Sequence, residues 1–207
     1  MILTFELIAL ISAIITIYAK FRENELLQYI FKPLTMLAII LLTILNVSSP
    51  PTFYQKMIVI GLIFSTVGDV FLIDSRRFIQ GLLSFLLAHI CFIIAFFSTP
   101  NLPSVIFYLA YVAFFLSILW KHLDNLKIPV IIYSLTLAAM SWLALSRYFE
   151  LNDHKSLFAF LGSVSFVASD SLLAFDKFKS AFPFAEVFIL STYFIAQWLI
   201  ALSVWFF

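Results

Sequence analysis

The sequence predicts an all-α integral membrane protein, a bundle of eight transmembrane helices that forms one domain over residues 1–207. Two observations carry this prediction: 64% of the residues are hydrophobic while only 11% are charged, and the apolar residues come in long runs. A soluble domain of this length does not need so apolar a composition for its core. A helix needs about 20 apolar residues to cross roughly 30 Å of hydrocarbon. The chain is therefore expected to be multi-pass and surrounded by membrane lipid, in the cell membrane if the source is bacterial.

The first four expected spans are 2–19, 33–47, 56–73 and 78–98. The first has no basic segment before it and no cleavage site before the charged run at 20–25, so we expect a retained helix and not a signal peptide. The second starts at Pro33, a residue that favours the first turn of a helix. It is the shortest span and is open to interpretation as a tilted or partly buried helix. The third follows Pro50 and Pro51, and the fourth ends before Pro100.

The last four expected spans are 103–120, 128–146, 156–175 and 182–206. Three of them begin at or next to a proline, namely Pro103, Pro129 and Pro183. The loops between spans are short, which leaves no soluble domain. The single cysteine, Cys91, excludes intrachain disulfides, and a net charge of +1 argues against a nucleic acid partner.

The positions of the cations predict the orientation of the chain, because lysine and arginine in short loops favour the cytoplasmic side. The odd-numbered loops hold most of the basic residues, and the even-numbered loops hold only Lys56, Arg147 and Lys155. Both termini are therefore expected on the non-cytoplasmic side.

Two aspartates, Asp69 and Asp170, interrupt apolar runs in matching contexts, each eight residues after a glycine: GLIFSTVGDVFLI and GSVSFVASDSLLAF. A carboxylate at membrane depth costs several kcal/mol unless it is paired, protonated or facing a polar cavity. Helices three and seven run in the same direction, so the two acids are expected at one depth. Small residues such as Gly61 and Gly162 are expected to let these two helices approach each other.

The matching contexts leave two interpretations open. One is a four-plus-four parallel repeat with halves 1–98 and 99–207, in which sites lie between the halves. The other is a chance likeness between apolar helices. In either case, carboxylates a few ångströms apart cannot both ionise easily, so they would share a proton and serve as acid and base.

Four further polar residues each have a structural and a functional interpretation. His89 either hydrogen-bonds a neighbouring helix or transfers a proton. Lys32 is expected at a helix boundary, where it either snorkels to the surface or binds a phosphate. Asp74 is a solvated loop acid or a contact for a cationic head group. Glu186 is stabilised by the N-terminus of the last helix or meets the same head group.

The remaining polar candidates at membrane depth are Tyr133, Tyr193 and Gln197, which either join helices or line a site. Tyr193 and Gln197 are four residues apart and share one helix face. A zinc site is not expected, since His122 and His154 fall in loops predicted on opposite sides of the membrane. The chain also lacks a G-x-S-x-G nucleophile motif.

These blocks resemble a known family. GLIFSTVGDVFLI followed by RRFIQGLLSFLLAHICFIIAF is similar to the YhhN-like family of lysoplasmalogenases, and so are FKPLTM, YSLTLAAM, GSVSFVASDSLLA and STYFIAQWLI, in order and at compatible spacing. The resemblance covers the second to the eighth span. It implies a membrane enzyme, a hydrolase that cleaves the vinyl ether bond of lysoplasmenylethanolamine or lysoplasmenylcholine. The products would be a fatty aldehyde and glycerophosphoethanolamine or glycerophosphocholine.

The resemblance implies no metal and no organic cofactor, and it implies a lysophospholipid as the bound partner. The family pattern marks seven positions here, which are Lys32, Asp69, His89, Tyr133, Asp170, Tyr193 and Gln197. Phe92 departs from it, because an aromatic hydroxyl often stands there in the family. On this basis Asp69 and Asp170 would supply acid and base in an unassigned order, Lys32 would face the phosphate, and Asp74 or Glu186 would meet an ammonium group.

Two other function classes fit the same residues. Paired intramembrane acids in a repeat fold also occur in lipid transporters and in proton-coupled transporters of small molecules. A non-catalytic scaffold is the third class, and it predicts that both aspartates tolerate replacement by asparagine.

Overall fold

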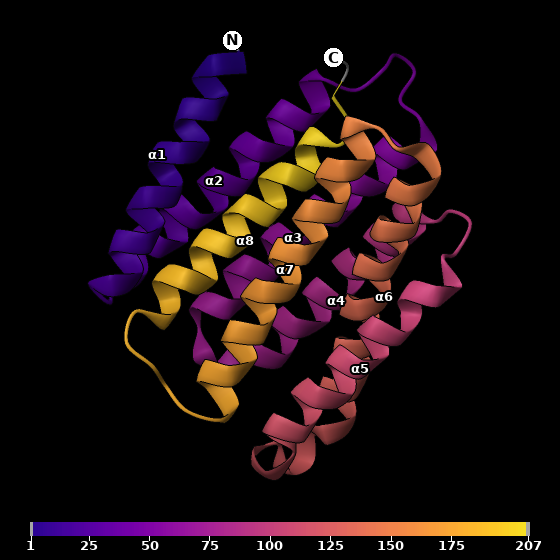
Figure 1. Ribbon diagram of the computed structural model, residues 1–207. Helices are drawn as coiled ribbons and strands as arrows, with labels where there is room; N and C mark the ends of the chain where they lie inside the picture. The colour runs from indigo at the N-terminus through magenta and orange to yellow at the C-terminus, as the bar shows by residue number, and fades with distance from the viewer. Residues whose placement is uncertain (1, 206–207) are drawn as a thin grey trace.

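The computed structural model describes residues 2–205, which form eight long α-helices and contain no strand (Figure 1). All eight are long and apolar enough to cross a membrane. The chain is therefore a multi-pass membrane helical bundle, as the composition predicts. The helices are α1 Ile2–Phe21, α2 Glu25–Leu45, α3 Phe53–Ile73, α4 Phe78–Phe96, α5 Leu102–Leu119, α6 Lys127–Leu151, α7 His154–Phe178 and α8 Ala185–Leu202. Single 3₁₀ turns at Ser75–Arg77, Trp120–His122 and Asp124–Leu126 lie in the loops.

The prediction that Pro33 opens the second helix is wrong. Helix α2 begins at Glu25, and the side chain of Asn24 caps it by accepting a hydrogen bond from the backbone N–H of Leu27 at 3.0 Å. Pro33 lies inside this helix, where it removes only one backbone hydrogen bond. The helix is consequently full length, and Lys32 lies in its interior and not at a boundary.

Side-chain caps and special backbone conformations set the other helix ends. Thr52 and Gln55 form a capping box at the start of α3, which satisfies two free N–H groups. Helix α6 ends at Leu151, five residues beyond the expected span, and Asn152 caps it in the left-handed conformation with φ 48°. Phe184 precedes α8 with φ 60°, so this helix starts at Ala185 and not at 182. The expected end of the last span at residue 206 lies outside the described residues.

The small residues of α3 and α7 do not bring these two helices together, contrary to the prediction. α3 packs mainly on α4, and α7 packs mainly on α8. A Cβ added at Gly61 would lie 2.3 Å from the ring of Phe92 on α4, and one at Gly162 would lie 3.0 Å from the carbonyl of Ala196 on α8. The glycines therefore allow two separate close helix pairs, α3 with α4 and α7 with α8.

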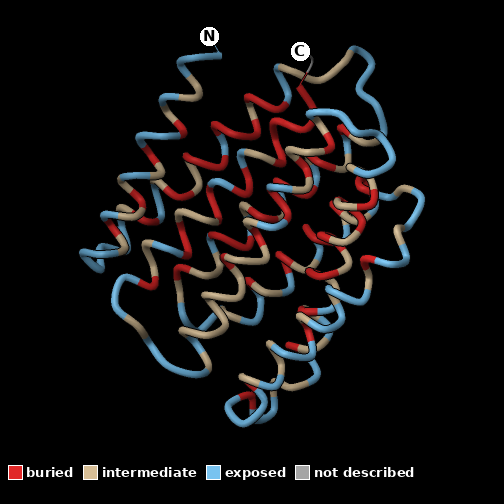
Figure 2. The backbone as a smooth tube through the Cα atoms, viewed as in Figure 1, coloured by how far each residue is buried: buried red, intermediate tan, exposed pale blue. Residues whose placement is uncertain are grey.

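The arrangement leaves α1 and α5 at opposite edges of the bundle, with α7 and α8 in front of α2, α3 and α4 in the view of Figure 1. α5 buries the smallest share of its residues and packs mainly on α6. Buried positions concentrate between the helices, while exposed positions cover their outer sides (Figure 2). Those outer sides are rich in leucine, isoleucine and phenylalanine, as lipid-facing surfaces are.

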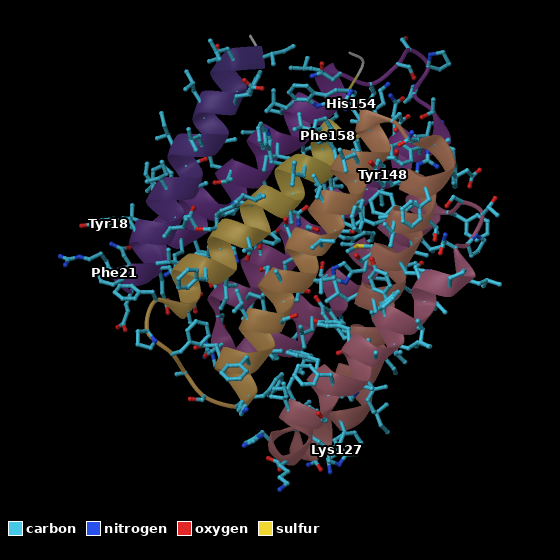
Figure 3. The ribbon with its side chains drawn as sticks, in the orientation of Figure 1. Tyr18, Phe21, Lys127, Tyr148, His154 and Phe158 are labelled. Atoms are coloured by element: carbon cyan, nitrogen blue, oxygen red, sulfur yellow. The ribbon has the colours of Figure 1, made fainter. Side chains whose placement is uncertain are left out.

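Both described ends of the chain lie at one end of the bundle (Figure 1), as an even number of spans requires. Aromatic side chains lie near both ends of the helices (Figure 3), with Tyr18 and Phe21 on α1 at one end and Tyr148 and Phe158 toward the other. Such positions suit the interfaces of a bilayer. The orientation of the termini and the internal repeat stay predictions.

Candidate active site

A polar cavity of about 240 Å³ lies between α1, α2, α3, α7 and α8. Its lining includes the last residues of α1 and α7 and the first turn of α8, which places it toward the end of the bundle that is remote from the termini (Figure 1). Charged and amide side chains are unusually dense there for a membrane protein. They are Lys20, Gln28, Lys32, Asp69, Asp170, Asp176, Lys177 and Glu186.

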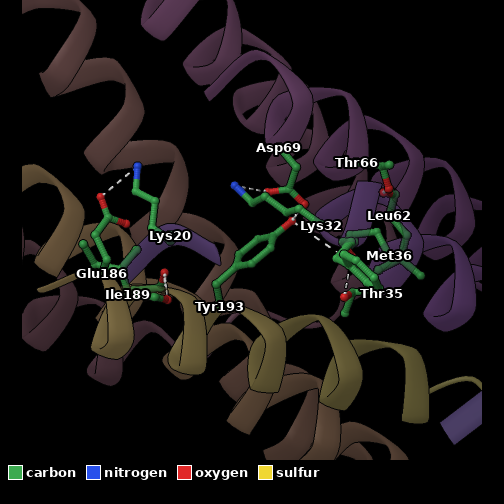
Figure 4. A network of polar contacts seen from close by, with 12 residues as sticks. Lys20, Lys32, Thr35, Met36, Leu62, Thr66, Asp69, Glu186, Ile189 and Tyr193 are labelled. Carbon is green, nitrogen blue, oxygen red and sulfur yellow. Dashed lines mark hydrogen bonds and ion pairs between the residues drawn. The ribbon is translucent and has the colours of Figure 1, made fainter. Parts of the chain in front are cut away.

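Asp69 is buried on α3 between two partners that reach it from other helices. The ammonium Nζ of Lys32 on α2 lies 3.0 Å from its Oδ1. The hydroxyl of Tyr193 on α8 donates to its Oδ2 at 2.6 Å (Figure 4). Only 1% of the Asp69 side chain and 10% of the Lys32 side chain are exposed. The pair is therefore a buried ion pair, and Lys32 does not snorkel to the surface.

Asp170 on α7 has a different environment. The hydroxyl of Tyr133 on α6 donates to its Oδ2 at 2.6 Å, and Nε2 of His89 on α4 lies 3.9 Å from the same oxygen. Among residues 2–205, neither a lysine nor an arginine forms an ion pair with Asp170. Its side chain is 11% exposed, toward the cavity that it helps to line.

His89 is fully buried, and in the described part of the chain both of its ring nitrogens lack a hydrogen-bond partner. Its ring meets the rings of Tyr133 and Phe166 edge to face, with centroids 5.3 Å and 4.7 Å away. Because Nε2 lies 3.9 Å from Oδ2 of Asp170, a small movement would bring the two groups into hydrogen-bond range. His89 is therefore placed to orient Asp170 or to exchange a proton with it.

The two carboxylates have matched but unequal partners. Each accepts a hydrogen bond from a tyrosine hydroxyl. Lys32 precedes Asp69 by the same 37 positions by which Tyr133 precedes Asp170. At the same spacing in the sequence, one acid thus has a cation as its partner and the other has a neutral phenol.

The other predicted site residues lie at different distances from this centre. Glu186 forms an ion pair with Lys20 at 3.2 Å at the edge of the cavity (Figure 4). Gln197 is fully buried one helical turn beyond Tyr193. Asp74 does not line the cavity. It binds Arg76 through Oδ1 and Oδ2, both at 3.0 Å, and the hydrogen bond from the Arg76 side chain holds the pKa of Asp74 below its ordinary value.

The structure adds four charged or amide residues of the cavity that the sequence did not single out, namely Lys20, Gln28, Asp176 and Lys177. All four lie in the first or last turns of helices. Charged side chains at helix ends are ordinary at a membrane interface, so their sequence positions do not separate them from other boundary charges. A usable signal would have been their common location at one end of the bundle.

A second, apolar crevice of about 40 Å³ lies between α4, α5, α6 and α7. It shares Asp170, Phe78 and Leu173 with the polar cavity, so Asp170 stands where the two meet. A third hollow, an apolar groove of about 340 Å³ between α1, α2 and α8, shares no lining residue with the polar cavity. No group of three or more histidine, cysteine, aspartate or glutamate side chains that could hold a metal ion occurs within residues 2–205.

Comparison with known proteins gives the family. The model of the YhhN family matches residues 27–204. The chain belongs to the YhhN family. The matched segment contains Lys32, Asp69, His89, Asp170 and Tyr193, whereas Lys20 lies outside it.

Several relatives within the family carry names. Lysoplasmalogenase TMEM86B of Homo sapiens is 33% identical over 159 residues, which cover 76% of this chain and 67% of that protein. The Sus scrofa protein of the same name is 33% identical over 146 residues, covering 70% of this chain and 61% of that protein. The chain thus spans about two thirds of the length of these relatives. The uncharacterized membrane protein YhhN of Escherichia coli O157:H7 is 26% identical over 202 residues, 94% of this chain and 95% of that protein. No solved structure matches the chain.

Proposed function

We propose that this chain is a lysoplasmalogenase, an enzyme that hydrolyses the vinyl ether bond of lysoplasmenylethanolamine or lysoplasmenylcholine. The products are a fatty aldehyde and the corresponding glycerophospho-alcohol. The names of the TMEM86B relatives support the activity. The observation that carries the mechanism is that two intramembrane carboxylates with unequal partners border one polar cavity.

The chemistry needs an acid and a base. A protonated carboxyl donates its proton to an alkene carbon, and the π electrons form the new C–H bond and leave an oxocarbenium ion. A water molecule adds to that ion and gives its proton to an ionised carboxylate, which yields a hemiacetal. The hemiacetal then collapses to aldehyde and alcohol, and both carboxyl groups return to their first states. A carboxylate near the developing positive charge also stabilises it electrostatically.

The cavity supplies groups of both signs for a zwitterionic head group. Lys20 and Lys177 line it together with Asp176 and Glu186, so cations are present for a phosphate and anions for an ammonium group. Lys32 is already paired with Asp69. We therefore assign it first to that carboxylate and only then, through its remaining N–H groups, to a substrate phosphate.

The test is an assay of aldehyde release from a lysoplasmalogen by purified protein. Asp69→Asn and Asp170→Asn should each lower kcat by about 100-fold or more, the contribution of general acid or base catalysis. Asp124→Asn is the matched control, because Asp124 is an exposed loop residue at φ 41°, a conformation that asparagine tolerates. Near-normal turnover by both folded site variants would refute the proposal.

A transporter is the alternative, and no contact among residues 2–205 favours it. It predicts substrate flux into proteoliposomes without any chemical change in the substrate. The same purified protein can be measured in both assays.

A further inference from the structure

We propose that the apolar crevice between α4, α5, α6 and α7 receives the first carbons of the alkenyl chain, and that Asp170 is the acid while Asp69 is the base. This proposal rests on the proposed function and adds to it where the tail lies and which carboxyl does what. The observation behind it is that Asp170 borders both the polar cavity and the apolar crevice, whereas Asp69 borders only the polar cavity.

A lysoplasmalogen has a polar part and an apolar part, as the cavity and the crevice do. Its glycerophospho head is charged, its tail is apolar, and the vinyl ether joins them. The polar cavity holds four acidic and three basic side chains, while the crevice is lined mainly by apolar residues such as Phe115, Val130 and Leu137. A molecule placed with its head in the first and its tail in the second puts the vinyl ether beside Asp170.

The crevice holds only a short part of the tail. Its volume of about 40 Å³ is little more than the ~30 Å³ that one water molecule occupies in the liquid. Phe78, Phe115 and Phe178, which line it, are only partly buried, and α5 on its outer side packs on little besides α6. We therefore place the first carbons of the chain in the crevice and the remaining carbons in lipid, past the edge of α5.

The groove between α1, α2 and α8 is the competing site for the tail. It is larger, about 340 Å³, and is lined by apolar residues such as Ile39, Phe194 and Trp198. Neither aspartate lines it. A tail in that groove would leave the vinyl ether remote from Asp170, so this groove does not fit the reaction.

The direction of the substrate assigns the two roles. In a vinyl ether, the carbon that carries the tail takes the proton, and the carbon bonded to oxygen takes the water. With the tail in the crevice, the carbon that carries the tail faces Asp170. The carbon bonded to oxygen lies toward the head-group side, where Asp69 is. Asp170 therefore donates the proton to form the C–H bond, and Asp69 accepts the proton of the attacking water.

The collapse of the hemiacetal reverses both transfers. The carbon–oxygen bond breaks, the glycerol oxygen takes the proton from Asp69, and the hemiacetal hydroxyl gives its proton to Asp170. The partners suit these roles: the Lys32 ammonium lies 3.0 Å from Asp69, whereas among residues 2–205 Asp170 has no lysine or arginine partner and meets the phenol of Tyr133 and the ring of His89. No further reactant besides water is needed.

Deuterium exchange tests the assignment of acid and base. In D₂O, Asp69→Asn should still protonate the alkene but capture water slowly, so the ion returns to substrate and the recovered lysoplasmalogen carries deuterium at the carbon next to the tail. Asp170→Asn should show no such exchange. Exchange in Asp170→Asn, or its absence in Asp69→Asn, would overturn the assignment. If the unmodified chain released no aldehyde, the proposed function itself would fail.

A chain-length comparison tests the crevice. Ala174 on α7 lines it one turn beyond Asp170, so Ala174→Phe should lower kcat/KM for a hexadecenyl substrate relative to a propenyl substrate. The expected fall in this ratio is about tenfold, since displacing about two methylenes at ~0.8 kcal/mol each has that effect. Ala13→Phe, in the competing groove, is the control and should leave the ratio unchanged.

Retained cleavage of the short substrate shows that Ala174→Phe is folded. Leu137→Ala, which widens the crevice, gives a second measurement and should also change the ratio of the two kcat/KM values. An unchanged ratio in both crevice variants, or a changed ratio in Ala13→Phe, would overturn the placement of the tail.

Discussion

Replacing Lys32 by methionine should separate the stability of the site from its chemistry. The variant keeps the length and apolar stem of the side chain but removes the ammonium that lies 3.0 Å from Asp69. Asp69 is 1% exposed, so bulk solvent does not screen the charge that the variant leaves unpaired. Breaking a buried pair by removing one partner costs about 3–5 kcal/mol. The loss of folding free energy cannot exceed the cost of protonating Asp69, which for an ordinary carboxylate at neutral pH is about 4 kcal/mol.

Thermal unfolding in detergent measures this cost. For a chain of 150–250 residues each kcal/mol shifts Tm by about 2–4 °C, so a cost of about 3–4 kcal/mol in Lys32→Met should lower Tm by about 6–16 °C. Adding Asp69→Asn to Lys32→Met should restore most of the loss, because the double variant buries no unpaired charge. Neither Lys32→Met nor the double variant should release aldehyde at the normal rate. A protonated aspartate or an asparagine at position 69 cannot accept the proton of water.

Lys20→Met provides the control. It breaks the pair of Lys20 with Glu186, in which the side chains are 32% and 40% exposed, and exposed pairs contribute about 0–1 kcal/mol. A Tm shift of Lys32→Met as small as that of Lys20→Met would refute the buried ion pair, and so would a double variant that is less stable than Lys32→Met alone.

Three further predictions follow from the contacts. Tyr193→Phe removes the hydroxyl that donates to Asp69 at 2.6 Å and should cost about 1.5–3 kcal/mol, the strength of a hydrogen bond to a charged group; an unchanged Tm would contradict that bond. Gly61→Ala would place a methyl 2.3 Å from the Phe92 ring and should lower Tm, whereas Gly61→Ala with Phe92→Leu should recover part of the loss if the clash is the cause. The predicted orientation requires that a tag at the N-terminus of intact cells be reached by an impermeant label; a tag that reacts only after lysis would reverse the topology.

The spans were predictable because lipid selects apolar runs by length alone. Each expected span overlaps one helix, and the errors occur where local chemistry outweighs hydropathy. At α2, the cap at Asn24 starts the helix eight residues before the expected start at Pro33. The second helix is therefore about two turns longer at its N-terminus than the sequence predicts. That error also misplaced Lys32, which looked like a boundary residue and lies in the interior of the helix.

Helix partners were not predictable from the same sequence. Gly61 and Gly162 correctly indicate close helix contacts, but an apolar helix face does not specify which neighbour covers it. α3 packs on α4 and α7 on α8, so the two aspartates reach the same cavity without a close contact between their own helices. The tyrosine that binds Asp69 comes from α8, 124 positions away in the chain, and no local pattern could have paired Tyr193 with Asp69.

A duplication, if the halves are related, would account for the likeness of the two aspartates in sequence, and their unequal partners would allow them to act differently. If the halves are related, Lys32 and Tyr133 occupy equivalent places, each 37 positions before its aspartate. A symmetric ancestor with a cation at both places would hold both acids ionised, and one with a phenol at both would leave each without a counter-ion. Acid–base catalysis needs one group of each kind. Under the proposed function, the difference between Lys32 and Tyr133 would supply the asymmetry that the reaction requires, and both aspartates line one polar cavity.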